Sequence, residues 1–357
     1  MNLLMISPMY PSKDDPVYGP FIKTYMDSFL ELNHSGKTQL ICIKGRSYNT
    51  YNKVRKYLWF YLQILYYLIF KSYDIVYVQT ITTTILPIKL ISYFKSLNII
   101  YNVHGADVIT MKKITERLRQ IAVPLLYKSK LIIVPSEYFK EIVLKMLPGL
   151  SDCQVFVSPS GGVDLELFKP SRENSRDYLT LGYVSRIDYG KGWDTYICAM
   201  SLLKKEGYSV RGIIAGRGSD QTAMIKMIKD KDVEDLIEYV GPIPHEELPL
   251  LFNKFDVFVF PSRRNESLGL VGVEALACGV PIIGSNYAAL PGYIIDGING
   301  YLFESGNVVD LYTKVKKIIL LPYEKKLLMS ENARRIASTY DTKVVMKDLY
   351  EKLNLII

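Results

Sequence analysis

Short apolar runs alternate with longer amphipathic stretches along most of the chain. In the first half, the apolar runs predict strands over 2–7, 38–43, 74–79, 98–103 and 130–134. In the second half, the same pattern predicts strands over 178–185, 211–215, 236–240, 256–260 and 281–284. Helical periodicity falls between these runs, for example over 21–33 and 53–70. This alternation predicts an α/β protein with doubly wound parallel sheets, whose ligands bind beyond the carboxyl ends of the strands.

One strand–loop–helix–strand unit, residues 256–286, carries the most informative pattern. A helix is predicted over 268–278, stopped by Gly279 and Pro281. Its first turn would leave the N–H groups of Leu268, Gly269 and Leu270 without intrahelical acceptors. Free donors and the positive end of the helix dipole attract phosphate, so this helix start is a candidate anion site.

Two carboxylates accompany this unit. Glu266 lies in the loop before the helix and Glu274 lies on the helix, eight residues later. On one helix that spacing would span about 12 Å, beyond the roughly 5–9.5 Å between the carboxylates of glycoside hydrolases. The two acids therefore suit the two ends of an elongated ligand better than a hydrolytic pair.

Cations and a histidine follow other predicted strand ends. Arg186 and Lys191 come after strand 178–185, in a loop opened by Gly190 and Gly192, and a helix is expected to begin near Trp193. Two cations there suit a diphosphate, at roughly 1.5–3 kcal/mol for each charge-assisted contact.

His104 follows strand 98–103 and is itself followed by Gly105. A single histidine is commonly structural, but one at a strand end of an α/β sheet lies where ligands bind. Asp107 is open to two interpretations, an acceptor contact or a cap of the next helix.

The string PS-x3-ES-x-G-L-x3-EA-x-A-x-G-x-P, from Pro261 to Pro281, resembles the donor-site signature of the retaining glycosyltransferases of family 4. The resemblance covers nearly the whole chain and is strongest over 180–305. It implies a GT-B fold, in which two Rossmann-like domains of doubly wound parallel sheet face each other across a cleft. The implied domains are 1–165 and 166–340, with a last helix, about 341–357, packing back on the first domain.

The resemblance also implies roles for individual residues. Glu266 would hold hydroxyls of the donor sugar, Glu274 the ribose, and His104 would lie beside the sugar. Arg186, Lys191 and the amides of Leu268, Gly269 and Leu270 would bind the donor diphosphate. Three more donor contacts are expected, at Gly19 in the loop Ser7–Pro20, at Gly216 in a glycine-rich turn, and at the Ile243 main chain near the base. The chain departs from the family after the signature, where Ala288-Ala289-Leu290-Pro291-Gly292 lacks the usual acid after proline.

Composition limits the binding partners, disulfides and metal sites that the chain is expected to have. The 357 residues carry a net charge of +8, but residues 1–150 hold 19 Lys and Arg against 9 Asp and Glu, so the excess lies in the N-terminal half. Nothing in the sequence resembles a nucleic-acid-binding motif, so an anionic membrane surface is the favoured partner of this half, with general solubility as the alternative explanation of its charge. Four cysteines without close pairing and three histidines predict neither a disulfide framework nor a metal site. We expect no metal and no cofactor other than the nucleotide sugar.

The run Tyr57–Phe70 is apolar and uncharged but shorter than the about 20 residues of a membrane-spanning helix. Two interpretations remain open, a buried helix before strand 74–79, or partial membrane contact with the cations of 53–56 facing lipid headgroups. The N-terminus lacks the pattern of a secretory signal. The sequence thus predicts a cytoplasmic protein, peripheral on the inner face of the membrane.

The resemblance implies a retaining hexosyltransferase, and the other features are consistent with it. It would use a nucleoside diphosphate sugar, with UDP favoured over GDP, and a lipid-linked or polysaccharide acceptor of bacterial surface glycan synthesis. Alternative predictions are a catalytically silent partner subunit, or a GT-B-like epimerase or phosphorylase.

Overall fold

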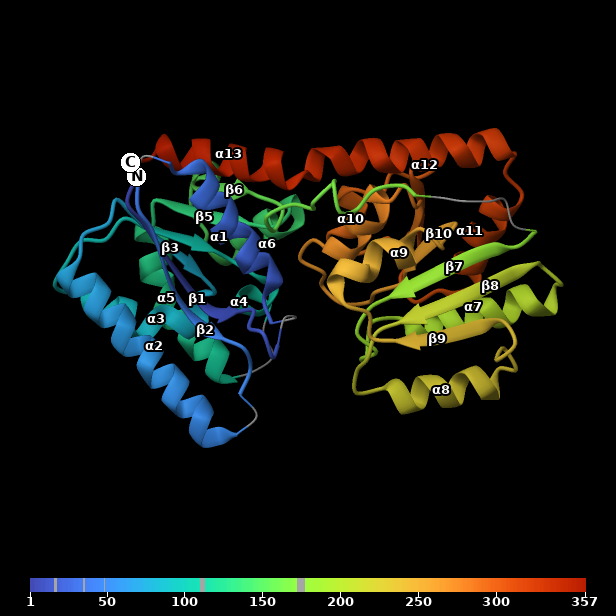
Figure 1. Cartoon of the computed structure of the whole chain (residues 1–357), viewed down its shortest axis with the longest axis horizontal. Helices are drawn as coiled ribbons and strands as arrows, with labels where there is room; N and C mark the ends of the chain where they lie inside the picture. Colours follow the sequence, from blue (N-terminus) through green and yellow to red (C-terminus); the bar gives the residue numbers. More distant parts are fainter. Residues whose placement is uncertain (16–17, 35, 48, 110–112, 172–176) are drawn as a thin grey trace. The chain divides into compact units, whose positions relative to one another are not determined.

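The computed structural model describes residues 1–15, 18–34, 36–47, 49–109, 113–171 and 177–357. The chain divides into two compact units (Figure 1). Unit 1 comprises Met1–Gly162 and Thr342–Ile357, and unit 2 comprises Val163–Asp341. Part of the loop expected before the first helix, residues 16–17, lies outside the described residues, as do residues 172–176, a few positions after the expected domain boundary.

Unit 1 is built on a six-stranded sheet whose paired strands are all parallel. In spatial order the strands are β2 (Thr38–Lys44), β1 (Leu3–Tyr10), β3 (Ile75–Gln79), β4 (Ile99–Asn102), β5 (Leu131–Val134) and β6 (Val155–Val157). The helices are α1 (Pro20–Leu32), α2 (Thr50–Phe70), α3 (Ile81–Ser92), α4 (Gly105–Val108), α5 (Lys113–Lys128), α6 (Glu137–Met146) and α13 (Thr342–Asn354).

The periodicity predicts most of these elements closely, but it does not predict β6, and it ends the first strand too early. β1 extends to Tyr10, whereas the sequence predicts a loop from Ser7. Pro8 lies inside the strand and has no N–H to donate. The pairing with β2 accordingly shifts register between Ser7 and Tyr10, and Ser7 Oγ donates to Met9 O at 2.7 Å. The strand continues past the proline through this local irregularity.

Unit 2 repeats the plan with a second parallel six-stranded sheet. Its order is β12 (Gly300–Phe303), β11 (Ile282–Ser285), β10 (Val257–Phe260), β7 (Leu179–Val184), β8 (Val210–Ala215) and β9 (Ile237–Gly241). The helices are α7 (Trp193–Lys205), α8 (Gln221–Asp230), α9 (Leu248–Phe252), α10 (Leu270–Ala277), α11 (Val308–Ile319) and α12 (Tyr323–Ala337).

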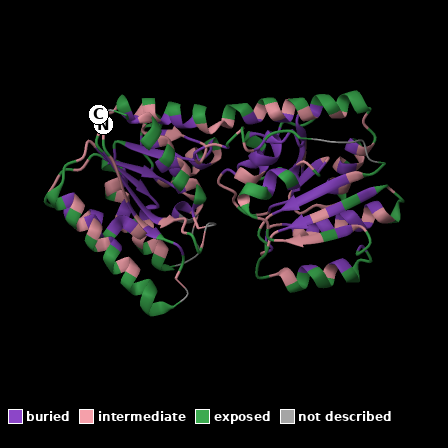
Figure 2. Cartoon of the chain, viewed as in Figure 1, coloured by how far each residue is buried: buried purple, intermediate pink, exposed green. Residues whose placement is uncertain are grey.

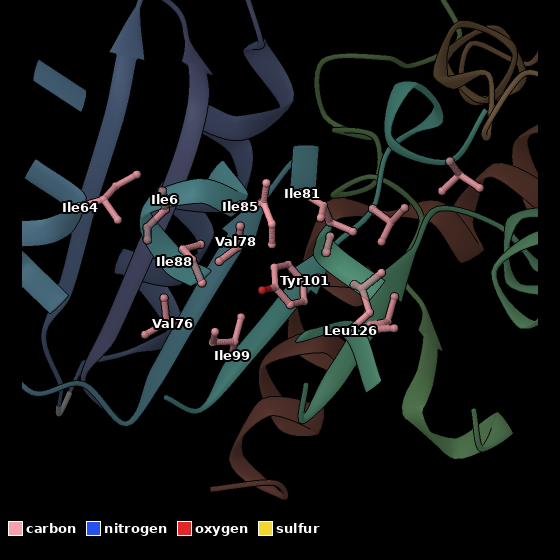
Figure 3. Close-up of a cluster of buried hydrophobic side chains, with 14 of the residues drawn as sticks. Ile6, Ile64, Val76, Val78, Ile81, Ile85, Ile88, Ile99, Tyr101 and Leu126 are labelled. Atoms are coloured by element: carbon pink, nitrogen blue, oxygen red, sulfur yellow. The ribbon is translucent and has the colours of Figure 1, made fainter. Parts of the chain in front are cut away.

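Apolar side chains fill the space between each sheet and its helices. In Figure 3 the isoleucines and valines of β1, β3 and β4 meet those of α2 and α3 in one such cluster. The central strands are almost entirely buried, the outer strands β2 and β9 are only partly buried, and the helices expose one face (Figure 2). α13 packs on unit 1 through Met346, Leu349 and Leu353, and Tyr350 Oη donates to Asn33 Oδ1 at 3.2 Å. No helix in the described parts of the chain is long and apolar enough to cross a membrane.

The strand orders locate the point where ligands bind. In unit 2 the chain order reverses between β7 and β10, and in unit 1 it reverses between β1 and β3. At such a switch point the two following loops diverge and leave a crevice beyond the carboxyl ends of the strands. The loops after β7 and β10, and those after β1 and β3, are therefore where functional side chains are sought.

Candidate functional site

The switch point of unit 2 brings together a cation and an acid that the sequence singles out separately. Lys191, in the loop after β7, donates from Nζ to Glu266 Oε1 at 2.6 Å, and Glu266 lies in the loop after β10. Both side chains are largely buried, at 12% and 15% exposure. Ser262 Oγ donates to the same Oε1 at 2.6 Å. The Glu266 carboxylate is therefore held at the carboxyl end of the sheet by a lysine and a hydroxyl.

Backbone conformation and a second ion pair position the lysine loop. Gly192 has φ 78°, and a Cβ on it would lie 2.0 Å from Pro261 O, so only glycine fits this contact between the two loops. Arg263 donates its N–H to Gly190 O at 2.8 Å and its Nη2 to both carboxylate oxygens of Asp194 at 2.9 and 2.8 Å. These contacts fix the two loops against each other.

Arg186, the second predicted cation, has an exposed side chain and pairs with Asp188 Oδ2 at 2.8 Å. Asp188 also accepts from the N–H of Ser219 at 3.0 Å. That hydrogen bond first, and then the charge of Arg186, hold the pKa of Asp188 below its usual value. Each of the two predicted cations thus has a carboxylate partner beside it.

Gly216 follows β8, the strand next to β7. Its φ is 130°, and a Cβ on it would lie 1.8 Å from Ser185 O, immediately before Arg186 in the chain. Its carbonyl accepts from Tyr239 Oη at 2.8 Å. The main chains of the two loops therefore approach each other closely at this glycine.

The helix after Glu266 begins later than the sequence predicts. α10 starts at Leu270, because Gly269 adopts the left-handed conformation at the N-cap, with φ 81°. Leu268 and Gly269 consequently precede the helix, and Leu268 is buried in the core. The orphan donors of the first turn are the N–H groups of Leu270 and Val271, since Gly272 N bonds Gly269 O at 2.8 Å. Of the three predicted amides, only that of Leu270 belongs to the helix.

Glu274, on α10, is buried and accepts from His245 Nε2 at 2.9 Å. His245 begins a 3-10 turn, His245–Glu247, and its ring packs on Phe168 with centroids 5.3 Å apart. The hydrogen bond to Glu274 raises the pKa of His245. Ile243, two residues earlier, is half-buried against the same core.

In unit 1, His104 lies at the carboxyl end of the sheet beside a neutral partner. Nε2 donates to Gln79 Oε1 at 2.7 Å, at the end of β3, and the ring meets Phe21 edge-on at 5.1 Å. Burial lowers the pKa of His104 to about 4, so the imidazole is neutral at pH 7. Asp107 accepts from His104 N and from Thr82, which agrees with the capping interpretation, and burial raises its pKa to about 6.

Gly19, the last predicted site residue, is the N-cap of α1. It has φ 71°, and a Cβ on it would lie 2.9 Å from Met9 Cγ. Pro20 follows at the first helical position, where its fixed φ suits a helix. The loop after β1 thus enters α1 through a backbone conformation that favours glycine.

The structure joins Lys191 directly to Glu266, and it pairs Arg186 and Glu274 with residues outside the predicted set. Sequence reasoning missed Ser262, Asp188 and Gln79, and it missed the contact of His245 with Glu274. Ser262 and Gln79 could have been found from their position at strand ends. Partners such as His245 and Glu274, 29 residues apart, leave no local signal.

The arrangement in unit 2 suits a ligand that has an anionic part and a hydroxyl-rich part. The ammonium of Lys191, the guanidinium of Arg186 and the start of α10 provide charge and donors for phosphate oxygens. Glu266 and Glu274 provide acceptors for hydroxyl groups. A nucleoside diphosphate sugar has both kinds of group.

Comparison with known proteins agrees with this geometry. Residues 165–336 match the family Glycosyl transferases group 1. An uncharacterized 41.2 kDa protein in the cps region of Klebsiella pneumoniae is 29% identical over 264 residues, covering 70% of this chain and 71% of that protein. The capsular polysaccharide biosynthesis glycosyltransferase CapM of Staphylococcus aureus is 26% identical over 181 residues, covering 50% of this chain and 46% of CapM.

Among solved structures, Anabaena HepE in complex with UDP and glucose superposes with a TM-score of 0.77 at 17% identity, covering 99% of this chain and 100% of HepE. This likeness shows the fold, two parallel α/β units of the GT-B type. Residues 165–336 thus match a group 1 glycosyltransferase domain, and the chain has the GT-B fold.

Proposed function

We propose that this protein transfers a hexose-type sugar from a nucleoside diphosphate sugar to a lipid-linked or polysaccharide acceptor in bacterial surface glycan synthesis. The observation that carries the proposal is the Lys191–Glu266 pair at the switch point of a group 1 domain. HepE was solved with UDP and glucose, and CapM is named for capsular polysaccharide biosynthesis, which favours UDP and a surface glycan.

The donor diphosphate would replace Glu266 as the partner of the Lys191 ammonium. Arg186, whose side chain is exposed, would bind the same diphosphate together with the N–H of Leu270. These groups would offset the charge that builds on the leaving diphosphate, and electrostatic stabilisation of this kind commonly contributes most to enzymatic rate enhancement.

Glu266 and Glu274 would bind the uncharged parts of the donor. Once Lys191 turns to the diphosphate, the Glu266 carboxylate is available to hydroxyls of the sugar. Glu274 would accept from ribose hydroxyls, with His245 holding its other side. The main chain at Gly216 and Ile243 would contact the nucleoside.

In unit 1, the neutral His104 would contact the transferred sugar, and the loop ending at Gly19 would contact donor phosphate or acceptor. We further propose retention of configuration by attack on the front face. The bond from the sugar carbon C1 to the diphosphate oxygen breaks as the acceptor oxygen bonds the same face. The leaving diphosphate oxygen takes the acceptor's proton.

The reaction is proposed to need no metal, because two cationic side chains already serve the diphosphate. Treatment with a chelator should therefore change the rate by no more than about twofold. A loss of activity on chelation, restored by a divalent ion, would contradict this part of the proposal.

Release of nucleoside diphosphate from a panel of nucleotide sugars tests the whole proposal. Wild type would be compared with Lys191→Ala and Glu266→Ala, and with Lys226→Ala as a matched control on α8, where the lysine is exposed. Turnover with one donor, lost in the first two variants and kept in the control, is the expected result. The configuration of the product then tests retention.

The competing function is a catalytically silent partner subunit. It would keep the fold without turning over any donor. Absence of both turnover and nucleoside diphosphate binding would favour it over the transferase.

A further inference from the structure

Helix α2 exposes apolar side chains on a face that has no charged residue over most of its length. The helix buries Phe60, Ile64 and Leu68 against the sheet. On its other side lie eight large apolar residues with exposures of 49–71%: Tyr51, Val54, Leu58, Trp59, Leu62, Tyr66, Ile69 and Phe70. We name these eight residues the outer stripe. In Figure 2 exposed residues recur from the first turn of α2 to the last.

The outer stripe differs from an ordinary solvent-facing helix surface. From residue 57 to residue 70 the helix contains no Asp, Glu, Lys or Arg at all. A helix that is apolar on both sides is expected to be covered on both sides. The spacing, with members three and four residues apart, makes one strip about 28 Å long at 1.5 Å per residue.

Positive charge lies at both ends of the stripe. Residues 32–95, which contain α2 and α3, hold nine Lys and Arg but a single acid, Asp74. At the N-terminal end of α2, Arg46, Lys53 and Lys56 line a pocket of about 270 Å³ together with Tyr18 and Tyr57. At the C-terminal end, Lys95 Nζ donates to Leu68 O and Lys71 O, both at 2.9 Å.

The contact made by Lys95 extends the apolar surface to α3. It holds the end of α3 against the end of α2, and the preceding residues Tyr93 and Phe94 are 70% and 83% exposed. Aromatic rings and lysines around an apolar strip are the composition of helices that lie in the headgroup region of a bilayer.

We propose that the outer stripe of α2 is a membrane-docking surface that binds the headgroup layer of an anionic bilayer, with the helix parallel to the membrane plane. Charge complementarity selects this occupant. Arg46 already pairs with Asp15. A neutral protein partner would offer no anion to Lys53, Arg55 and Lys56, and a second copy of the chain would bring like charges together, whereas anionic lipid headgroups neutralise them. The proposal deepens the proposed function, on which it rests, by stating how the enzyme reaches a lipid-linked acceptor.

Co-sedimentation with vesicles tests it. The full chain should bind vesicles of phosphatidylglycerol and phosphatidylcholine, and bind pure phosphatidylcholine vesicles weakly. The double variant Trp59→Glu/Leu62→Glu should lower the partition by about tenfold or more. The matched control Leu327→Glu/Leu328→Glu adds the same charge at exposed leucines of α12 and should bind as wild type.

Charge is tested in the same assay. Lys53→Gln/Arg55→Gln should weaken binding to anionic vesicles, and Lys226→Gln/Lys229→Gln on α8 should not. Binding should also fall at about 1 M salt, where the Debye length is about 3 Å. In a Trp193→Phe background, Trp59 is the sole tryptophan, and its emission should shift to the blue on binding.

The outcomes separate this proposal from the transferase. Vesicle binding without any nucleotide turnover would keep the docking surface and remove the proposed function. Nucleotide turnover with equal partition of wild type and Trp59→Glu/Leu62→Glu would overturn the docking surface. A concentration-dependent dimer that Trp59→Glu/Leu62→Glu dissociates, with no vesicle binding, would also overturn it in favour of a second copy.

Discussion

The carboxyl ends of the two sheets differ in charge although both sheets are parallel and six-stranded. In unit 2 charged side chains pair with one another, Lys191 with Glu266 and Arg186 with Asp188, and His245 bonds the Glu274 carboxylate. In unit 1, His104 bonds a neutral amide, and burial keeps the imidazole uncharged at pH 7. The same strand–helix plan therefore has ion pairs at the carboxyl end of the sheet in unit 2 and a neutral histidine at the carboxyl end of the sheet in unit 1.

The difference indicates which part of a donor would suit the carboxyl end of each sheet. A cation that pairs with a carboxylate can exchange it for an incoming phosphate, because phosphate oxygens also accept charge-assisted hydrogen bonds. A neutral imidazole can donate or accept without repelling or attracting charge. The comparison thus supports the proposal that a diphosphate binds to unit 2 and that a neutral hydroxyl-bearing group lies beside His104.

Removing the central cation should have the largest effect. Lys191→Ala is expected to lower donor turnover by about 100-fold or more, because the diphosphate loses a charge-assisted contact that strengthens as the bond breaks. Steady-state rates beside Lys226→Ala measure it. A turnover within a few-fold of wild type would mean that Lys191 does not bind the diphosphate. It would contradict the functional contrast between the carboxyl ends of the two sheets.

Gly216→Ala tests how closely the loops after β7 and β8 pack against each other in unit 2. Gly216 and Gly207 both have positive φ, but a Cβ meets Ser185 O at 1.8 Å in the first case and nothing within 4 Å in the second. We expect Gly216→Ala to lower the free energy of unfolding by about 3 kcal/mol and Gly207→Ala by about 1 kcal/mol. Urea unfolding compares them. Equal losses would mean that backbone strain alone, and not the close approach of the two loops, demands glycine.

His104 should make stability depend on pH with one sign. Its pKa is about 4 in the folded chain and near 6.5 in the unfolded chain, so the unfolded state binds more protons between these values. The stability from the neutral ring is complete above about pH 6.5 and is lost as the pH falls toward about 4.

His104→Gln removes this loss. Relative to wild type, the variant should gain about 2 kcal/mol in unfolding free energy on going from about pH 7 to about pH 4.5. Asp107, whose raised pKa acts in the opposite direction, is present in both proteins. His34→Gln, at an exposed histidine, is the control in urea titrations at the two pH values. A pH-independent difference would show that His104 is not buried as a neutral ring.

His245 should show the opposite sign and the smallest effect. Its pKa is raised by Glu274, so the stability it contributes is complete below about pH 6.5 and is lost as the pH rises through the folded-state pKa. His245→Gln should therefore destabilise more at about pH 6 than at about pH 9, by about 1 kcal/mol or less, since the ring is partly exposed and screened. Greater destabilisation by His245→Gln at about pH 9 than at about pH 6 would contradict the opposite signs expected for the two histidines.

The sequence predicts the fold better than the site. Strands such as β3 and β10 are buried on both faces and are short apolar runs, so periodicity identifies them. The start of α6 is predictable from its cap, where Ser136 Oγ accepts from Phe139 N at 3.3 Å. By contrast, the sequence pattern places the start of α10 two residues early, because the left-handed conformation of Gly269 depends on its packing near Phe260.

Pairing of charges could not be predicted, since it depends on which strands become neighbours. Lys191 and Glu266 are 75 residues apart and meet because β7 pairs with β10. The resemblance alone assigns each residue a role, and the fold supplies the contact. The apolar run of α2 is open, from sequence, to burial or membrane contact. One face is buried, which confirms the first interpretation in part, and the exposed other face leaves the second as a proposal.

Calorimetric titration with a nucleoside diphosphate tests the central claim most directly. In the ligand-free chain the Lys191 ammonium is paired with Glu266, so a diphosphate must displace that carboxylate. Glu266→Gln should therefore bind nucleoside diphosphate as tightly as wild type or more tightly while losing sugar transfer, and Lys191→Ala should lose binding. Equal binding by wild type and Lys191→Ala would contradict the account.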